Sequence, residues 1–473
     1  MPVTTPHPQY KEYADKWRKC RDVIAGEEAV KDAGTTYLPR LEGQEDDDYW
    51  AYVKRACFFG ATKRTREGLV GAILRREPRV VAPDSLVELL GDVGHRRESL
   101  REIIRSVLEE TLDVGRVGIL ADAPDVENAD PYVALYHAEN IISWRESDVG
   151  GRRQLTRVVL REPYLEEDPK DPFALKSRER FRVLMLDTEG EVPLYRVEVW
   201  VPKDPESKAK DQEMVLAEEY VPRRKGGSTF DQIPFVIVGA GGTDPCVDDP
   251  PLLEVVNVNL AHYRGSADLE LGRHWTAIPT PYVANGEVKD VLTVGGAEAW
   301  IIPGENVRVG YLEFTGAGLN HLARGQEDKE RQMSVLGARL LESPRPGVEA
   351  AETVRLRQSG EQSVLSKIAQ SVSDGLTMAL QWVASWVNPN QDAEVMVELS
   401  TDFEALGITP QMFATLLAAE SAQQISWQVM HHNLRRGELI PDDIDMETEA
   451  ELIAAGRPGG EGGLRRSEGD DDE

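Results

Sequence analysis

The chain has 473 residues, 41% of them hydrophobic and 29% charged, which is enough for about three compact units with buried cores. Its formal net charge of −29 argues against a protein that binds nucleic acid tightly through a basic surface. The three cysteines form no CxxC pair, and no apolar run approaches about 20 residues, which argues against a disulfide framework, a zinc site and a membrane span.

The first residues also lack the apolar core of a signal peptide, so we expect no leader here. Residues 1–125 are predicted to be mainly helical, with Tyr13, Trp17, Cys20 and Ile24 at helical spacing. The clearest helix begins after Ser99, which has capping-box spacing to Glu102, and should end near Gly115. A short strand is expected at 117–120. The acidic cluster Glu45 to Asp48 is interpreted as an exposed loop between helices.

Residues 130–240 change to a period near two, which predicts a mostly antiparallel β unit. Thr188, Glu189 and Gly190 indicate a turn within it. The charged stretches 166–176 and 203–212 are interpreted as exposed loops. The expected strands are 132–137, 141–146, 155–161, 181–187, 195–201, 214–220 and 234–238.

A long polar helix pattern follows over about 250–273, with an apolar stripe on one side only. Its other faces carry polar residues, among them Asn259 and His262, and we expect it to pack along one narrow seam. A small β segment is predicted over about 281–313, and then a helix over about 319–341. The break Ser343-Pro344-Arg345-Pro346-Gly347 precedes another helix over about 351–387.

The C-terminal part contains weaker signals. Thr409 and Pro410 form an N-cap and N1 pair for a further helix, and 426–436 is predicted to be another. Residues 457–473 are rich in glycine and acidic residues and are predicted to be disordered.

Motifs that could carry chemistry are weak. The segment 234–245 begins like a dinucleotide fingerprint, but Asp244 stands where the third glycine belongs, so a plain loop is the better interpretation. The pair His431 and His432 is interpreted as solvent-exposed. Asp248 and Asp249 precede a helix start, where they can serve as caps. No Walker A loop, GxSxG elbow or HExxH motif occurs. We assign no catalytic, cofactor-binding or metal-binding residue and expect no enzyme.

Several stretches resemble tailed-bacteriophage portal proteins, in particular the portal-like subfamily formerly listed as a phage domain of unknown function. The resemblance covers about residues 98–387. The stretches that carry it, in the family's order, are VGRVGILAD (114–122), AENIISWRE (138–146), HYRGSAD (262–268), PTP (279–281), NG (285–286), YLEFTGAGL (311–319) and MSVLGARLLE (333–342).

This resemblance implies an α+β portal-like subunit with a helical and β wing, long stem helices, a small β-containing clip, a long kinked wing helix and a helical crown. The implied divisions are 1–248 wing (helical 1–125, β-rich 130–240), 249–280 stem helix, 281–317 clip, 318–342 second stem helix, 343–350 tunnel loop, 351–400 long wing helix and following strand, 401–456 crown and 457–473 acidic tail.

It further implies a ring, usually of about twelve copies, at one capsid vertex, through which double-stranded DNA is packaged and ejected. The implied partners are further copies of the chain, the DNA, the large terminase, the head–tail adaptor and a capsid or scaffolding protein, with no membrane and no cofactor. The implied location is the virion, after assembly in the host bacterial cytoplasm. Ser343, Pro344, Arg345, Pro346 and Gly347 would form the DNA-facing tunnel loop. An ordinary interhelix turn with an exposed arginine is the alternative for that segment.

Two other functions remain open at the level of sequence. One is a metal-dependent nuclease or nucleotide-handling phage enzyme that uses the acidic cluster Glu45 to Asp48. The other is an interaction scaffold that assembles without a central channel.

Overall fold

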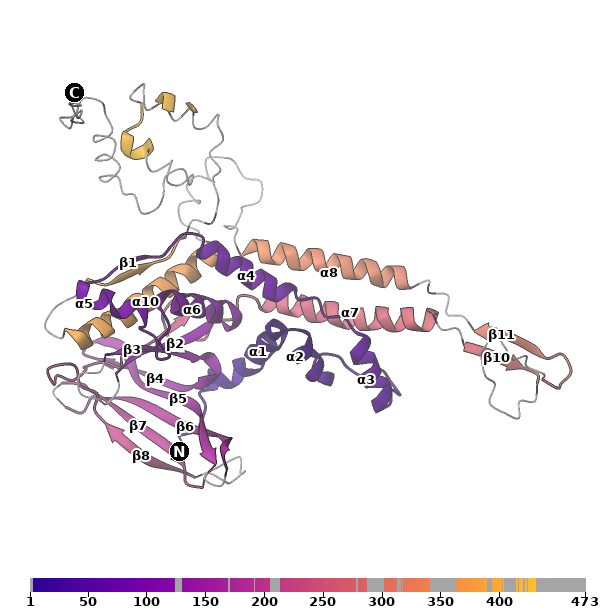
Figure 1. The fold of residues 1–473 in the computed structure, drawn as a ribbon, viewed down its shortest axis with the longest axis horizontal. Helices are drawn as coiled ribbons and strands as arrows, with labels where there is room; N and C mark the ends of the chain where they lie inside the picture. The colour runs from indigo at the N-terminus through magenta and orange to yellow at the C-terminus, as the bar shows by residue number, and fades with distance from the viewer. Residues whose placement is uncertain are drawn as a thin grey trace, which may run out of the picture.

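The computed structural model shows an α+β protein with a globular body and a long projecting arm (Figure 1). It describes residues 3–123, 130–168, 171–190, 192–204, 213–277, 280–286, 302–312, 316, 318–340, 363–388, 394–401, 403, 414–415, 417–419, 422 and 424–430. Among the described helices, none combines the length and the hydropathy needed to cross a membrane.

The helices are α1 (Pro8–Ala25), α2 (Glu27–Asp32), α3 (Asp46–Arg55), α4 (Ala61–Ile73), α5 (Asp84–Val87), α6 (Leu100–Val114), α7 (Leu253–Ala277), α8 (Leu319–Arg339) and α10 (Val364–Val387). The strands are β1 (Arg79–Val81), β2 (Arg116–Asp122), β3 (Tyr132–His137), β4 (Ile141–Val149), β5 (Arg152–Asp168), β6 (Asp171–Asp187), β7 (Leu194–Pro202), β8 (Met214–Tyr220), β9 (Phe235–Gly239), β10 (Thr280–Ala284), β11 (Arg308–Leu312) and β12 (Met396–Glu398).

Helix α6 begins and ends as the sequence predicts. The Ser99 hydroxyl accepts from the Glu102 N–H while the Glu102 carboxylate accepts from the Ser99 N–H, so both halves of the capping box are present. Gly115 ends the helix with a left-handed φ of 74°, a conformation that costs glycine little. The chain then enters β2, whose residues are buried throughout.

Two antiparallel sheets build the body. The first has the strand order β3-β2-β9, and α6 and α10 pack against it. The second has the order β4-β5-β6-β7-β8. The predicted strands therefore form and the antiparallel prediction is confirmed, but the single β unit is divided: β3 and β9 leave it to pair with β2. The turn predicted at 188–190 lies between β6 and β7.

Two predicted loops are wrong. The described parts of 166–176, residues 166–168 and 171–176, belong to the paired strands β5 and β6, where cross-strand ion pairs stabilise charged residues. The acidic cluster is the N-cap and first turn of α3, where carboxylates interact favourably with the helix dipole. Its side chains are nevertheless exposed, as expected. Of 203–212, only residues 203 and 204 are described.

Helices α7 and α8 lie side by side in the arm, which ends in the antiparallel pair β10 and β11 (Figure 1). Helix α7 has 25 residues and is therefore about 37 Å long. It also packs against α1, α3 and α4 of the body. The prediction of one narrow seam is wrong, because α7 packs against these three helices as well as against α8, and its polar residues Asn259 and His262 are buried.

The break at 343–347, residues 351–362 of the predicted long helix, the proposed helix at 409, the histidines 431–432 and the tail 457–473 all lie outside the described residues. So does most of 401–456. Of the helix predicted at 426–436, residues 427–430 are described and are helical.

Candidate functional site

Two glycines of α7 lie in close contact with side chains of α8. A Cβ on Gly265 would collide with the side-chain amide of Gln326, and one on Gly272 would collide with Leu319. Gly265 and Gly272 are seven residues apart, and so are their partners Leu319 and Gln326. Seven residues is the heptad spacing of two helices packed along their length. The arm is therefore a regular antiparallel helix pair whose glycines on α7 receive side chains from α8.

Buried polar groups connect the first half of α7 to the body. The Asn259 amide donates to the Phe59 carbonyl at 2.9 Å and accepts from the Thr62 hydroxyl at 3.4 Å. The Ser266 hydroxyl donates to the Cys57 carbonyl at 2.7 Å and accepts from the Cys57 N–H at 2.9 Å. These bonds give partners to backbone groups of the α3–α4 connection. These hydrogen bonds hold α7 against the α3–α4 connection and so set how far α7 extends from the body.

Farther along α7, two contacts with α3 hold the arm where it leaves the body. The Tyr52 hydroxyl donates to the Asp268 carboxylate, and burial together with that bond raises the pKa of Tyr52. Arg55 lies 3.3 Å from the Nε2 of His274. Between α7 and α8, His262 lies 3.3 Å from Glu330, and burial lowers the pKa of this histidine in spite of the carboxylate.

The end of the arm exposes large apolar side chains. Trp275 is 63% exposed at the end of α7, and Tyr311 is 55% exposed on β11. Tyr282 and Val309, which belong to the same strand pair, are also exposed. Exposed aromatic groups in one small region are typical of a surface that contacts another macromolecule.

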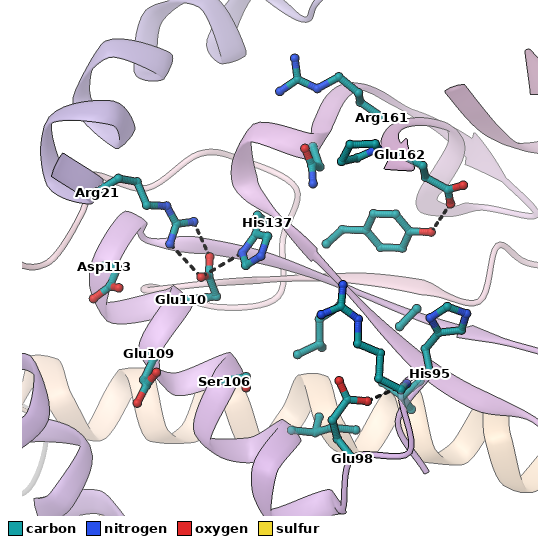
Figure 2. A pocket seen from close by; sticks show the side chains of 18 of the residues that line it. Arg21, His95, Glu98, Ser106, Glu109, Glu110, Asp113, His137, Arg161 and Glu162 are labelled. Atoms are coloured by element: carbon teal, nitrogen blue, oxygen red, sulfur yellow. Dashed lines mark hydrogen bonds and ion pairs between the residues drawn. The ribbon is translucent and has the colours of Figure 1, made fainter. Parts of the chain in front are cut away.

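The body contains a cleft of about 950 Å³ between α1, α4, α6, β3 and the β5–β6 strands (Figure 2). One wall carries a connected ionic cluster. Arg21 donates to Glu110 through both terminal nitrogens and also contacts Glu139, while the Nδ1 of His137 lies 2.9 Å from Glu110. The sequence reasoning missed this cluster, since its members come from separate elements.

Ionisation in the cleft is strongly perturbed. Burial opposes the charge of Glu110, but hydrogen bonds from His137 and Arg21 outweigh it and lower the pKa of Glu110 to about 2. The same hydrogen bond raises the pKa of His137. Asp113 behaves oppositely: burial and the charge of Glu110 outweigh Arg66, 3.1 Å away, and raise the pKa of Asp113 to about 7.

The glycine-rich loop after β9 is occupied by the chain itself. The Asp248 carboxylate accepts from the Gly241 N–H at 2.8 Å, and Asp244 accepts from the Cys246 N–H at 2.9 Å. Carboxylates thus lie where a phosphate would need free N–H groups, as the plain-loop interpretation expects. Asp249 pairs with Lys16, so both predicted helix caps have other partners.

The acidic cluster on α3 has little of what a nuclease centre needs. Asp46 pairs with Arg40 at 2.6 Å. The other members of the cluster, Glu45, Asp47 and Asp48, are exposed. Within the described part of the chain, no three histidine, cysteine, aspartate or glutamate side chains lie close enough to hold a metal ion.

The predicted tunnel loop, Ser343 to Gly347, lies outside the described residues, but the ends of the segment that contains it do not. Helix α8 is followed by Leu340, and Ser363 caps α10 by accepting from the Ser366 N–H. The Leu365 N–H donates to the Leu340 carbonyl at 3.2 Å. The two helices therefore meet at the base of this segment.

One family model matches the chain. It is described as a domain of unknown function, DUF4055, and it matches residues 251–387, the span from α7 through β10, β11 and α8 to α10. The arm and the helix after it thus coincide with the matched region. No curated protein matches the sequence.

Solved structures with a similar trace belong to gene transfer agent (GTA) particles. The neck of an empty GTA particle, computed with C6 symmetry, has 12% identity and a TM-score of 0.37 over 88% of this chain and 100% of that chain. The virion of a native GTA particle has 12% identity and a TM-score of 0.35 over 91% and 99%. The neck of a native GTA particle, computed with C12 symmetry, has 10% identity and a TM-score of 0.36 over 84% and 95%.

Proposed function

We propose that this protein is a phage portal subunit that closes into a ring at one capsid vertex, through which double-stranded DNA is packaged and ejected. The observation that carries the proposal is the arm, in which a long antiparallel helix pair joins a globular body to a small β tip. Wing, stem and clip occur in this order in the family that the sequence resembles. The stem helices would be α7 and α8, and the clip would contain β10 and β11.

Charge on the arm suits a channel wall that DNA slides past. Helix α8 carries four lysines or arginines and three carboxylates. Helix α7 carries two arginines and three carboxylates. The arm helices are therefore close to neutral in a chain with a net charge of −29. A neutral wall of mixed charges offers phosphate no continuous basic surface on which to stick. The α8 groups are Arg324, Lys329, Arg331 and Arg339 with Glu327, Asp328 and Glu330.

The remaining elements of the proposal follow from the same role. The segment 343–347 would reach the DNA from the fixed base at Leu340, and Arg345 would contact phosphate transiently. The exposed apolar tip of the arm would meet the large terminase during packaging and the head–tail adaptor afterwards. The body would contact capsid or scaffolding protein. The protein would then be a component of the virion, assembled in the host bacterial cytoplasm, and not itself an enzyme.

The native mass of the purified protein, with electron micrographs of the same sample, tests the proposal. A ring of twelve chains of 52.6 kDa would have a mass of about 630 kDa and a central hole. A compact dimer without a hole would contradict the proposal. So would a protein that stays monomeric both alone and with its capsid protein.

A further inference from the structure

A small pocket lies where α1 and residues 36–37 meet the arm helix α7, and we call it the α1–α7 pocket. Its volume is about 380 Å³. Three of its lining side chains are cations, Arg18, Lys19 and Arg264, and one is a carboxylate, Asp15. The other lining residues are neutral: Thr36, Tyr37, Asn257 and Leu260. The pocket is therefore positively charged in a chain with a net charge of −29.

Two of the three cations have no carboxylate partner. Lys19 donates to the amide oxygen of Asn257 at 3.3 Å, and Arg264 donates to a main-chain carbonyl at 3.5 Å. Among the described residues, no carboxylate forms an ion pair with either cation. Arg18 lies 3.6 Å from Asp15, but the two side chains are 63% and 90% exposed, so this pair is weak. The positive charge of the pocket is thus largely unbalanced.

The first turn of α3 has the complementary feature. Asp46 pairs with Arg40. Asp47 and Asp48 are exposed and, within the described part of the chain, contact no cation. Trp50, three residues after Asp47, is 45% exposed, and residues at this spacing lie on one face of a helix. Tryptophan is enriched where proteins contact each other, so this face suits a protein partner that carries cations.

The pocket and the first turn of α3 lie at nearly the same level along the arm. Helices α1 and α3 both pack against α7 where the arm leaves the body (Figure 1). On α3, Tyr52 binds Asp268, which lies one turn beyond Arg264 on α7. Tyr52 is itself one turn beyond Asp48. Rotation about a channel that runs along the arms therefore brings the first turn of α3 to the level of the pocket in the next copy.

We propose that the α1–α7 pocket of one copy binds the first turn of α3 in the next copy. Lys19 and Arg264 would bind the two unpaired carboxylates of that turn. Trp50 would lie at the rim, where Arg18 offers a guanidinium to its ring. Opposite charges across a contact fix its register and disfavour other partners. The contact joins two different surfaces and so repeats head to tail, and it rests on the proposed function for its closure into a ring.

Exchange of charge between the two surfaces tests the contact. Asp47→Lys with Asp48→Lys reverses the surface on α3. Lys19→Glu with Arg264→Glu reverses the pocket. Each pair alone should raise the concentration needed for half-assembly by about tenfold or more, because like charges then face each other. The four changes together should restore assembly to within about threefold of the unaltered protein. A combined variant no better than either pair would overturn the contact.

Two further variants separate the contact from folding and from net charge. Lysines in a first turn oppose the helix dipole, so Asp47→Asn with Asp48→Asn is a milder pair that should still weaken assembly. Asp84→Lys with Glu88→Lys changes two other exposed carboxylates, at α5 on the far side of the body from α3 (Figure 1). This control makes the same change of net charge and should assemble normally. Equal weakening in the control would overturn a specific contact.

A zero-length cross-link identifies the partner directly. In the assembled protein, a carbodiimide should join the Lys19 amine to Asp47 or Asp48 as an amide. Chains with and without an isotope label, mixed before assembly, show whether the two halves come from different copies. Lys19→Arg keeps the charge but lacks the amine, so it should assemble and lose only this link. A link found only within single chains would overturn the proposal.

Native mass and micrographs of the same samples distinguish this contact from the proposed function. Rings without the link between copies would overturn the contact and leave the portal proposal standing. The link between copies in open filaments, without rings, would support the contact and contradict the portal proposal. A protein that stays monomeric both alone and with its capsid protein would contradict both.

Discussion

The Leu365 N–H donates a hydrogen bond to the carbonyl of Leu340 at 3.2 Å, which holds the start of α10 against the end of α8. The segment between them therefore leaves and returns at one fixed place. Changes within it should alter what it touches without displacing either helix.

This relationship predicts the effect of changes at 343–347. Arg345→Ala, and separately a shortened 343–347 segment, should leave ring assembly and thermal stability unchanged and lower DNA packaging several-fold, because the loop would lose its phosphate contact. The measurement is the amount of DNA packaged per capsid. Arg101→Ala, at a side chain 70% exposed on α6 in the body, is the control and should package normally. Packaging at the unaltered level in both loop variants would favour the ordinary interhelix turn.

The glycine seam predicts a clear difference between two helical glycines of the arm. Gly265→Leu should destabilise the protein by about 1–3 kcal/mol, because the new side chain meets Gln326 and Lys329 across the seam. Gly325→Leu, which meets only the far end of Lys329, should be neutral or stabilising by up to about 1 kcal/mol, since glycine is a poor helix former. Urea unfolding measures both, and faster hydrogen exchange along α8 should accompany only the first change. Equal effects would contradict the seam.

Local signals in the sequence predicted much of the fold. The bounds of β3 and β8 agree with the prediction at both ends, because each strand lies between clear breaks in a period-two pattern. The capping box of α6 was equally local. The glycines at 265 and 272 were visible as well, but their meaning depends on α8, whose register against α7 cannot be read from one helix.

The errors come from neighbours that periodicity does not contain. Asn259 and His262 look like exposed residues on a polar face, yet α7 packs against α1, α3 and α4 as well as against α8, and both side chains are buried. The stretch 166–176 looks like a charged loop, yet its charges pair across two strands. Long-range pairing decided both cases. The cleft is a third example, since Arg21, Glu110 and His137 belong to three separate elements.

Glu110 should stabilise the protein at neutral pH. Its folded pKa of about 2 lies below the ordinary value of 4.5, so its contribution is present above about 4.5 and is lost as the pH falls toward 2. Glu110→Gln should therefore lower the free energy of unfolding by about 3 kcal/mol at pH 6 and by much less at pH 3. Urea unfolding at the two pH values measures this. Glu109→Gln, on the same helix and more exposed, is the control, and a loss independent of pH would argue against an ionic role for Glu110.

Asp113 should give the opposite slope. Its folded pKa of about 7 lies above the ordinary value of 3.8, so the folded state favours the protonated form, and stability falls as the pH rises from about 4 to 7. Across this window the loss from this one group is at most about 4 kcal/mol. Asp113→Asn cannot ionise, so its free energy of unfolding should fall less between pH 5 and pH 8 than that of the unaltered protein. Parallel pH profiles for the two proteins would mean that Asp113 is already ionised at pH 5, held by Arg66. Because Glu110 loses its contribution on the acid side and Asp113 on the basic side, the cleft should be most stable near pH 4.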